Sequence, residues 1–354
     1  MRWTRALDRK VVYRFESGLE IRLHNLLAGI GLMLVALILA ALAVETGATS
    51  TGMTDLLQNI FGSGLSDDQA YALWTVRLPR LLMAFLAGWC VAISGAILQS
   101  IARNPLADPG LFGLSQGSMT TILLLMVLAP AAPKILVAGA AMAGGLCVAL
   151  LLIWLVGGER SSGLAIMLMG IAMETVLSST NTLMLLYTPS EVSMGLSQWL
   201  AGSLFQSSWS LIATFLPAFG LSFAGIFLWG RALSTYDLGN EMAMALGEPL
   251  GRSRPLILIF AVFLNAAAVT AVGPLTFLGV LAPHIAGFLS PASGRARLLL
   301  SGLVGGILVI GADTVARRLA GDLPLPIGLS LTIIGVPLFI LALRLQALSR
   351  KHKH

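Results

Sequence analysis

The stretch "RLPRLLMAFLAGWCVAISGAILQSIARNPLADPGLFGLSQGS", residues 77–118, indicates the fold. Two arginines stand at its start, and an uncharged, mostly apolar run follows them as far as Arg103. The polar segment "RNPLADPG" then interrupts the pattern, and a second apolar run begins. An apolar run of about 20 residues is long enough to cross a bilayer as a helix. The stretch therefore predicts two membrane-spanning helices joined by a tight polar connection.

The composition extends this interpretation to the whole chain. Of its 354 residues, 57% are hydrophobic and only 11% are charged, whereas soluble domains usually carry about 25% charged residues. So few charges cannot cover a water-exposed surface, which excludes a soluble domain. The apolar runs are continuous and rich in Leu, Ala and Met instead of alternating, which favours helices over strands. We therefore expect an all-α polytopic membrane protein.

Ten apolar runs have the length and composition of spanning helices. They cover residues 26–44, 79–101, 110–129, 135–156, 164–187, 209–230, 255–272, 275–290, 298–319 and 327–345. The sequence thus divides into a basic N-terminal segment (1–25), a transmembrane domain (26–345) and a basic tail (346–354).

The basic residues predict the orientation of these spans. An even number of spans places both ends of the chain on one side, and both ends are rich in Arg and Lys. With the termini inside, most of the 22 Lys and Arg residues fall in inner segments, as the positive-inside rule requires. We expect both termini to be cytoplasmic. The net charge of +6 follows from this distribution, so we expect no nucleic-acid partner.

The same topology places Arg77 and Arg80 outside, at the entrance of the second span, and Arg317 and Arg318 outside, at the exit of the ninth. These charges oppose the insertion bias. One interpretation is that they extend to the outer lipid headgroups. The other is a basic rim that receives an acidic partner, because guanidinium binds carboxylate through two parallel hydrogen bonds.

The stretch at residues 77–118 resembles the second and third spans of ABC permeases that import iron–siderophore complexes, haem and vitamin B12. Further segments resemble the same family in the same order. They are "WLAGSL" (199–204), "DLGNEMAMALG" (237–247), "GPLTFLGVLAPHIAGFL" (273–289), "GADTVARRL" (311–319) and "LPIGLSLTIIGVPLFIL" (325–341). Together they extend over most of the chain beyond residue 75.

This resemblance implies a set of partners and a location. The family's ten-span subunits pair around a translocation path in the bacterial inner membrane, here with a heterodimer favoured and a homodimer possible. A periplasmic binding protein delivers the substrate, and two ATPase subunits bind from the cytoplasm. The family's outer arginines form salt bridges with acidic residues of the binding protein, and Arg77, Arg80 and Arg317 are the matching positions.

The chain has no nucleotide site of its own, because a P-loop needs lysine after glycine and none of the lysines follows one. ATP and Mg²⁺ would be bound by the partner ATPases, and we expect no cofactor on this chain. Residues 231–254 match the family's coupling loop, whose core at 238–247 predicts a short helix between two glycines. Candidate ATPase contacts are Leu238, Glu241, Ala245, Leu246 and Gly247, with Arg103, Asn104 and Pro105 as a possible second contact.

Three titratable residues inside apolar runs have competing interpretations. Glu174 and Asp313 would be relay groups in a proton-coupled transporter, but Asp313 has Arg317 at i+4, so an intrahelical ion pair would neutralise it. His284 would act as a pH switch, a metal ligand or, most simply, a packing residue. Because no second His or Cys lies at ligand spacing, we predict no metal site.

These observations predict a permease subunit of an ATP-driven importer that carries a ferric siderophore. Haem and vitamin B12 are alternative substrates within the same family. Rivals from other classes are a proton-coupled secondary transporter and a membrane scaffold without a transport role.

Overall fold

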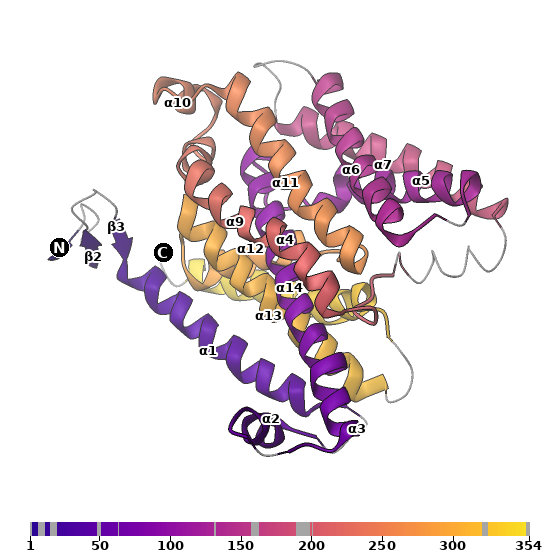
Figure 1. Ribbon diagram of the computed structural model, residues 1–354. Helices are drawn as coiled ribbons and strands as arrows, with labels where there is room; N and C mark the ends of the chain where they lie inside the picture. Colours follow the sequence, from indigo (N-terminus) through magenta and orange to yellow (C-terminus); the bar gives the residue numbers. More distant parts are fainter. Residues whose placement is uncertain are drawn as a thin grey trace.

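A computed structural model describes residues 2–5, 11–14, 20–47, 51–62, 64–130, 132–156, 163–188, 199, 201–320 and 325–351. The molecule is a bundle of long helices with short connections (Figure 1). Seven described helices are long and apolar enough to cross a membrane, and three shorter apolar helices accompany them. This confirms the prediction of a polytopic helical protein with about ten apolar helices.

The ten helices match the ten predicted runs, with small shifts at their ends. They are α1 (Leu23–Glu45), α4 (Leu78–Ala102), α5 (Leu114–Leu128), α6 (Lys134–Val156), α7 (Gly163–Leu186), α9 (Trp209–Tyr236), α11 (Leu250–Val272), α12 (Leu278–Leu289), α13 (Gly294–Ala320) and α14 (Ile327–Lys351). The last helix continues beyond residue 345 into the segment predicted as a basic tail.

Helix α4 forms the centre of the bundle. Nearly all of its residues from Met83 to Ala102 are buried, and α9, α11, α12 and α13 surround it (Figure 1). Helix α13 runs antiparallel to α4 and packs closely against it. A Cβ added at Gly88 would lie 2.5 Å from the carbonyl oxygen of Gly305. The glycine-rich composition thus lets two backbones touch, as expected for helices that associate in lipid.

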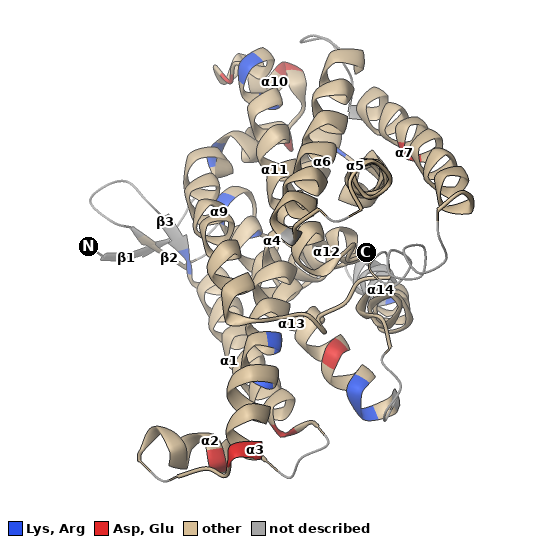
Figure 2. Cartoon of the chain, turned by 45° about the vertical axis from the view of Figure 1, so that its right-hand side comes forward, with Lys and Arg blue, Asp and Glu red and all other residues tan. Residues whose placement is uncertain are grey.

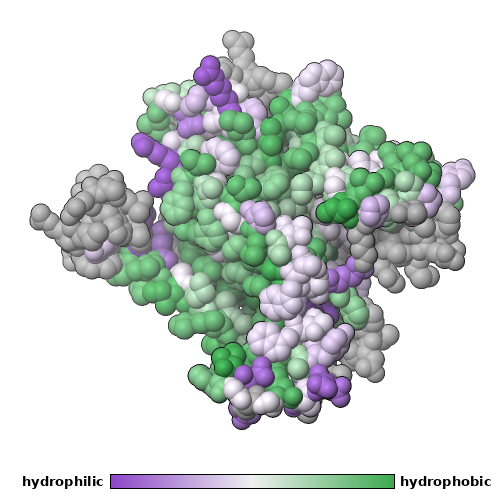
Figure 3. Space-filling view, viewed as in Figure 1, coloured by the Kyte–Doolittle hydropathy of each residue, from purple (hydrophilic) through white to green (hydrophobic). Residues whose placement is uncertain are grey.

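The outer helices carry the apolar surface. Helix α1 exposes large hydrophobic side chains along most of its length, including Leu37 and Ile38. Hydrophobic residues cover the middle of the face shown in Figure 3. Strongly hydrophilic residues occur near α10 (Asn240–Ala245) at the top and near α2 (Met53–Ile60) and α3 (Asp67–Ala70) at the bottom. Such an apolar belt is what a bilayer-embedded surface requires.

The N-terminal segment adds a feature that the sequence did not predict. Strands β1 (Arg2–Arg5), β2 (Val11–Arg14) and β3 (Glu20–Arg22) form a small antiparallel sheet in the order β1-β2-β3. It lies beside the start of α1 (Figure 1), and α1 begins directly after β3. The all-α prediction therefore describes the bundle, and the predicted segment 1–25 contains a sheet and the first turn of α1.

The connection between α1 and α4 lies at the opposite end of the molecule from α10 (Figures 1 and 2). It contains α2 (Met53–Ile60), α3 (Asp67–Ala70) and a turn of π-helix, η1 (Tyr71–Arg77). Pro79 follows η1 in the first turn of α4. A proline ring clashes with the carbonyl four residues earlier, and the wider π turn before Pro79 avoids that clash. Helical structure thus begins upstream of the predicted start at residue 79.

Two of the segments that resemble the permease family meet in space although they are far apart in sequence. The amide of Ile327 donates to the carbonyl of Gly202 at 3.1 Å, and the amide of Gly328 donates to Ala201 at 3.0 Å. The amide of Ser203 donates to the carbonyl of Val272, the last residue of α11, at 2.7 Å. The "WLAGSL" segment therefore ties the end of α11 to the start of α14.

Candidate functional site

One buried carboxylate organises the arginines that follow α3 and end α13. Arg80 Nη2 lies 2.7 Å from Asp313 Oδ1, and Arg80 Nε donates to the same oxygen at 2.9 Å. Arg317 Nε donates to Asp313 Oδ2 at 3.0 Å. The Asp313 side chain is 3% exposed. The predicted pairing of Asp313 with Arg317 is confirmed, and Arg80, from a different helix, is a second partner.

Arg77 is directed into the protein. Its Nη1 donates to the carbonyl of Val44 at 2.6 Å and also to the carbonyl of Thr51. Arg77 is only 6% exposed, and a Cβ at Gly47 would lie 2.6 Å from its guanidinium. The side chain thus stabilises the connection after α1 through these hydrogen bonds. A docking role for Arg77 stays a prediction.

The remaining arginines of this end differ in exposure. Arg317 Nη1 donates to the carbonyls of Ala43 and Thr46, which leaves its side chain 20% exposed. Arg318 Nε donates to Thr46 Oγ1 at 3.1 Å, yet the residue is exposed. Arg318 was not among the predicted docking residues, because adjacent arginines in a sequence give no sign of which one faces outward.

We call Arg77, Arg80, Arg317, Arg318 and Asp313 the arginine cluster. Two of its four arginines, Arg80 and Arg317, bind its one carboxylate, so its net charge is positive. Exposed acids also occur at this end of the molecule, on α3 at Asp67 and Asp68 (Figure 2). The phenyl ring of Phe205, itself largely exposed, lies 5.7 Å from the Arg80 guanidinium. The cluster therefore combines an internal ion pair with an exposed cationic and aromatic edge.

At the opposite end of the molecule, helix α10 (Asn240–Ala245) forms part of the connection between α9 and α11 (Figure 1). The short helix predicted within 238–247 is confirmed. The loop is shorter than the predicted range 231–254, because α9 continues to Tyr236 and α11 begins at Leu250. Because α9 and α11 are longer than predicted, a helix end lies close to α10 on each side and supports it.

The exposed side chains of this connection are mainly apolar. All five predicted contact residues are exposed: Leu238, Glu241, Ala245, Leu246 and Gly247. Met242 and Met244 are also about half exposed, at 52% and 51%, and neither was among the predicted contacts. Only Ala243 of α10 is buried. Exposed apolar side chains that lie together in this way are typical of surfaces that contact another protein or a membrane.

A polar network holds α10 in place. Arg254 Nη2, on α11, donates to Asn240 Oδ1 at 2.7 Å, and the guanidinium lies over the Tyr236 ring at 5.9 Å. The Tyr236 hydroxyl is 2.6 Å from Ser253 Oγ. The last residue of α9 and the first turns of α10 and α11 are thereby joined, which orients the exposed side chains of α10.

The predicted second contact lies against the first. Arg103 ends α4 in a left-handed conformation with φ 51°, and a Cβ on Gly239 would lie 3.2 Å from its guanidinium. Arg103 and Pro105 are exposed, whereas Asn104 Nδ2 donates to the sulfur of Met167 at 2.8 Å. Two segments far apart in the sequence thus form one surface with α10.

The connection from α4 to α5 turns back into the protein after Leu106. Asp108 is buried, its Oδ2 accepts a hydrogen bond from the Gly110 amide at 2.9 Å, and its Oδ1 lies in the interior. Burial raises the pKa of the Asp108 carboxyl to about 6, and the amides of Gly110, Gly279 and Val280 partly oppose this. A carboxyl here titrates close to physiological pH.

Helices α5 and α7 share polar side chains within the bundle. Gln116 Nε2 is 3.4 Å from Glu174 Oε1, so Glu174 has a partner that the sequence did not reveal. Asn181 Nδ2 donates to Gln116 Oε1 at 3.0 Å, and Thr120 Oγ1 donates to Asn181 Oδ1 at 2.7 Å. Further hydroxyls on α7 are exposed, at Thr175, Ser179, Thr180 and Thr182. The exposed surface of α7 therefore combines these hydroxyl residues with large apolar ones such as Leu168, Val176 and Leu183.

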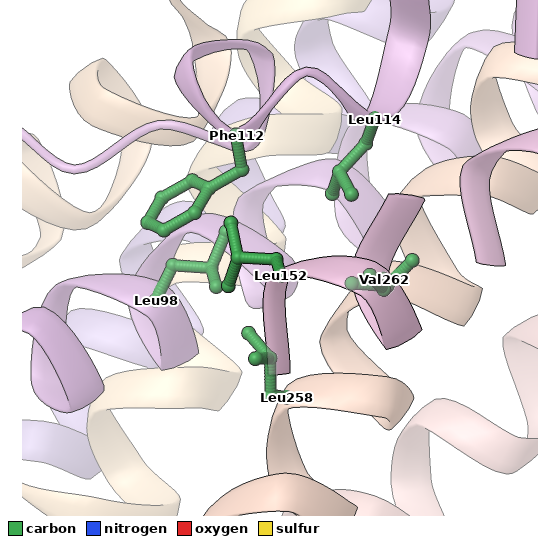
Figure 4. A pocket seen from close by; sticks show the side chains of 7 residues that line it. Leu98, Phe112, Leu114, Leu152, Leu258 and Val262 are labelled. Carbon is green, nitrogen blue, oxygen red and sulfur yellow. The ribbon is translucent and has the colours of Figure 1, made fainter. Parts of the chain in front are cut away.

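The described residues show two further features that bear on ligand binding. One pocket is wholly apolar and too narrow for a water molecule. Its lining residues are Leu98, Phe112, Leu114, Ala149, Leu152, Leu258 and Val262 (Figure 4). His284 packs edge-on against Phe339, with ring centroids 4.9 Å apart. Among the described residues no group of three or more His, Cys, Asp and Glu could hold a metal ion.

A family model, the FecCD transport family, matches residues 32–345. The chain belongs to the FecCD transport family. The Fe(3+)-citrate import system permease protein YfmE of Bacillus subtilis (strain 168) is 31% identical over 322 residues, which are 91% of this chain and 96% of that protein. The ferric enterobactin transport system permease protein FepG of Escherichia coli (strain K12) is 34% identical, over 78% of this chain and 82% of the relative.

A solved structure has the same fold as this FecCD chain. It is described as an inward-facing conformation of a metal-chelate type ABC transporter and matches with a TM-score of 0.77 at 27% identity. The match covers 90% of this chain and 99% of the other. Other relatives are named for cobalamin import and for hemin transport. This chain is an ABC importer permease, and FecCD relatives as a group serve several chelates.

Proposed function

We propose that this chain is the membrane-spanning subunit of an ATP-driven importer that moves a ferric siderophore across a bacterial inner membrane. The observation that carries the proposal is the surface of α10, where Leu238, Met242, Met244 and Leu246 are each more than half exposed. These side chains have an apolar surface to bury and no partner surface within the described chain, and a separate ATPase subunit supplies one.

The second part of the proposal concerns delivery of the substrate. The arginine cluster docks a periplasmic binding protein through the groups that remain accessible, Arg318 and the outer faces of Arg80 and Arg317. Arginines bind carboxylates in a directed, bidentate manner. Charges at the edge of an interface act mainly on the rate of encounter and on orientation, so this contact positions the binding protein over the transporter.

The third part concerns the translocation path. The described residues around the pocket of Figure 4 are tightly packed, so we place the path between two permease subunits and not inside one. The exposed Ser and Thr residues of α7 support this placement. Their hydroxyls donate to carbonyls of the same helix, but each oxygen can still accept a hydrogen bond from water, which a water-filled path would supply. The second subunit is either a different FecCD chain, which we favour, or a second copy.

The buried pair of Arg80 and Arg317 with Asp313 bears on the secondary-transport alternative. A proton relay needs a carboxylate that is accessible and free to exchange its proton, whereas the buried Asp313 is bound by Arg80 at 2.7 Å and by Arg317 at 3.0 Å. Glu174 has only an amide as its observed partner. The proposal therefore assigns the energy source to ATP.

The test is uptake into proteoliposomes that contain this chain, its ATPase and its membrane partner. With binding protein outside the vesicles and ATP inside them, we expect import of a ferric siderophore. Without ATP, we expect no import. Ferric citrate, a ferric catecholate, a ferric hydroxamate, haem and cobalamin form the substrate panel. A preference for haem or cobalamin would change the assigned substrate. Uptake driven by a proton gradient without ATP would refute the proposed function.

A further inference from the structure

The α10 connection is linked to the interior by one arginine side chain. Asp237 follows α9 directly and precedes α10 by three residues. Arg297, in the first turn of α13, lies with Nη1 3.3 Å from Asp237 Oδ1. The same Nη1 donates to Ser100 Oγ at 3.1 Å, and Nη2 donates to Gln99 Oε1 at 2.9 Å. One guanidinium thus joins the base of α10 to the last turns of α4.

Gln99 continues this connection into the protein. Its side chain is buried, and its Nε2 donates to the carbonyls of Gly279 at 3.3 Å and Val280 at 3.5 Å, at the start of α12. In an α-helix the carbonyl of Gly279 would accept from the amide of residue 283. That residue is Pro283, which has no N–H. Gln99 therefore supplies the donor that the α12 backbone lacks.

Asp108 also packs against this turn. A Cβ on Gly279 would lie 2.6 Å from Asp108 Oδ1, and that oxygen is buried without a hydrogen-bond partner among the described residues. Asp108 belongs to the connection that also carries Arg103, which packs against Gly239. The first turn of α12 thus accepts hydrogen bonds from Gln99 and lies close to Asp108, and both residues belong to segments that reach the surface containing α10.

We propose that Arg297 and Gln99 are positioning residues that transmit movement of the α10 connection to the first turn of α12. The inference rests on the proposed function, in which α10 contacts the ATPase. A buried polar group left without its partner is unfavourable, so a displaced Asp237–Arg297 pair shifts Gln99, and Gln99 shifts α12. The chain Asp237, Arg297, Gln99, Gly279 is the coupling chain.

The central test uses Gln99→Leu, which keeps the side-chain volume and removes both contacts. Its matched control is Ser222→Ala, because Ser222 is also buried and binds α4, accepting from Trp89 Nε1 at 2.9 Å, but lies outside the coupling chain. In reconstituted importer we measure ATP hydrolysed and substrate imported. We expect Gln99→Leu to raise the ATP used per substrate about fivefold or more, the scale of ordinary coupling between sites, while Ser222→Ala leaves that ratio unchanged.

A second variant guards against misfolding. Gln99→Glu retains an acceptor for Arg297, which holds it ionised, and removes only the donor to Gly279. It too should raise the ratio of hydrolysis to import. Arg297→Gln combined with Gln99→Leu should be no worse than the more severe single variant, because both break the same chain.

The outcomes separate this inference from the proposed function. If the parent imports with ATP and both Gln99 variants keep the parental ratio, the coupling chain is wrong and the function stands. The coupling chain is also wrong, with the function intact, if the effects of Arg297→Gln and Gln99→Leu multiply. If the parent itself shows no ATP-dependent import, the proposed function is wrong.

Discussion

The two ends of the molecule use their side chains in opposite ways. In the arginine cluster, three of the four arginines are directed inward: Arg77, Arg80 and Arg317 bind backbone carbonyls or Asp313. At α10, apolar groups point outward, and Met242 and Leu246 are exposed. A charged residue in a membrane protein is therefore no reliable sign of a surface. Exposed hydrophobic side chains on a polar connection indicate a partner more directly.

The largest effect is expected from breaking the buried ion pairs of the arginine cluster. Asp313→Asn leaves Arg80 and Arg317 in place with no carboxylate between them. Removing one partner of a buried ion pair typically costs about 3–5 kcal/mol, so the thermal unfolding temperature in detergent should fall sharply. Asp67→Asn is the control, because Asp67 is exposed on α3. Equal unfolding temperatures for Asp313→Asn and the parent would show that the cluster does not stabilise the fold.

The next effect concerns pH and the buried Asp108. Its pKa of about 6 lies above the ordinary value, so the folded state binds this proton more tightly than the unfolded state. The stability that the proton contributes is present at low pH and is lost as pH rises through 6. Because burial raises this pKa from 3.8 to about 6, the contribution to stability is at most about 3 kcal/mol.

Asp108→Asn has no carboxyl to ionise and should lack this dependence. We expect the unfolding temperature of the parent, relative to Asp108→Asn, to decrease between pH 4.5 and pH 7. Differential scanning fluorimetry of both purified proteins measures the difference. A constant difference across this range would mean that Asp108 keeps an ordinary pKa.

A smaller effect on stability, but a large one on transport, is expected at α10. Met242→Asp places a charge on an exposed apolar surface, so the unfolding temperature should change little. Binding of the ATPase should weaken by about 2 kcal/mol, roughly thirtyfold, as for a central interface residue. Co-purification and titration of ATPase activity measure this. Ala243→Asp, on the buried face of α10, is the comparison and should destabilise the protein. If Met242→Asp leaves ATPase binding intact, the assigned interface is wrong.

The smallest effect is expected from the exposed edge of the arginine cluster. Arg318→Glu should slow association of the binding protein by about tenfold or less at low salt, and less at high salt, because rim charges act through long-range attraction. Arg231→Glu, on the far end of α9, is the control. Association rates from surface plasmon resonance at two salt concentrations give the comparison, and identical rates for Arg318→Glu and the parent would remove Arg318 from the docking surface.

The sequence predicted best what depends on local composition. Ten apolar runs gave ten helices, and two glycines around helix-forming residues gave α10. The failures involve partners far apart in the chain. Nothing near Arg80 indicates Asp313, and nothing near Gln99 indicates the proline that frees the carbonyl of Gly279.

Other features were missed for reasons of geometry and length. The direction of Arg77 depends on how the segment after α1 folds over it. The N-terminal sheet was missed because its strands have three or four residues each, too few for an alternating pattern to stand out from a basic segment.

The contact between α4 and α13 has one more consequence. The pair is fastened near both tips, by Arg80 with Asp313 and by Arg297 with Gln99, and its backbones touch midway at Gly88 and Gly305. Two helices joined at three points along their length bend little, so the pair moves as one rigid unit about 35–40 Å long. A tilt imposed at one surface of the bilayer must then reappear at the other.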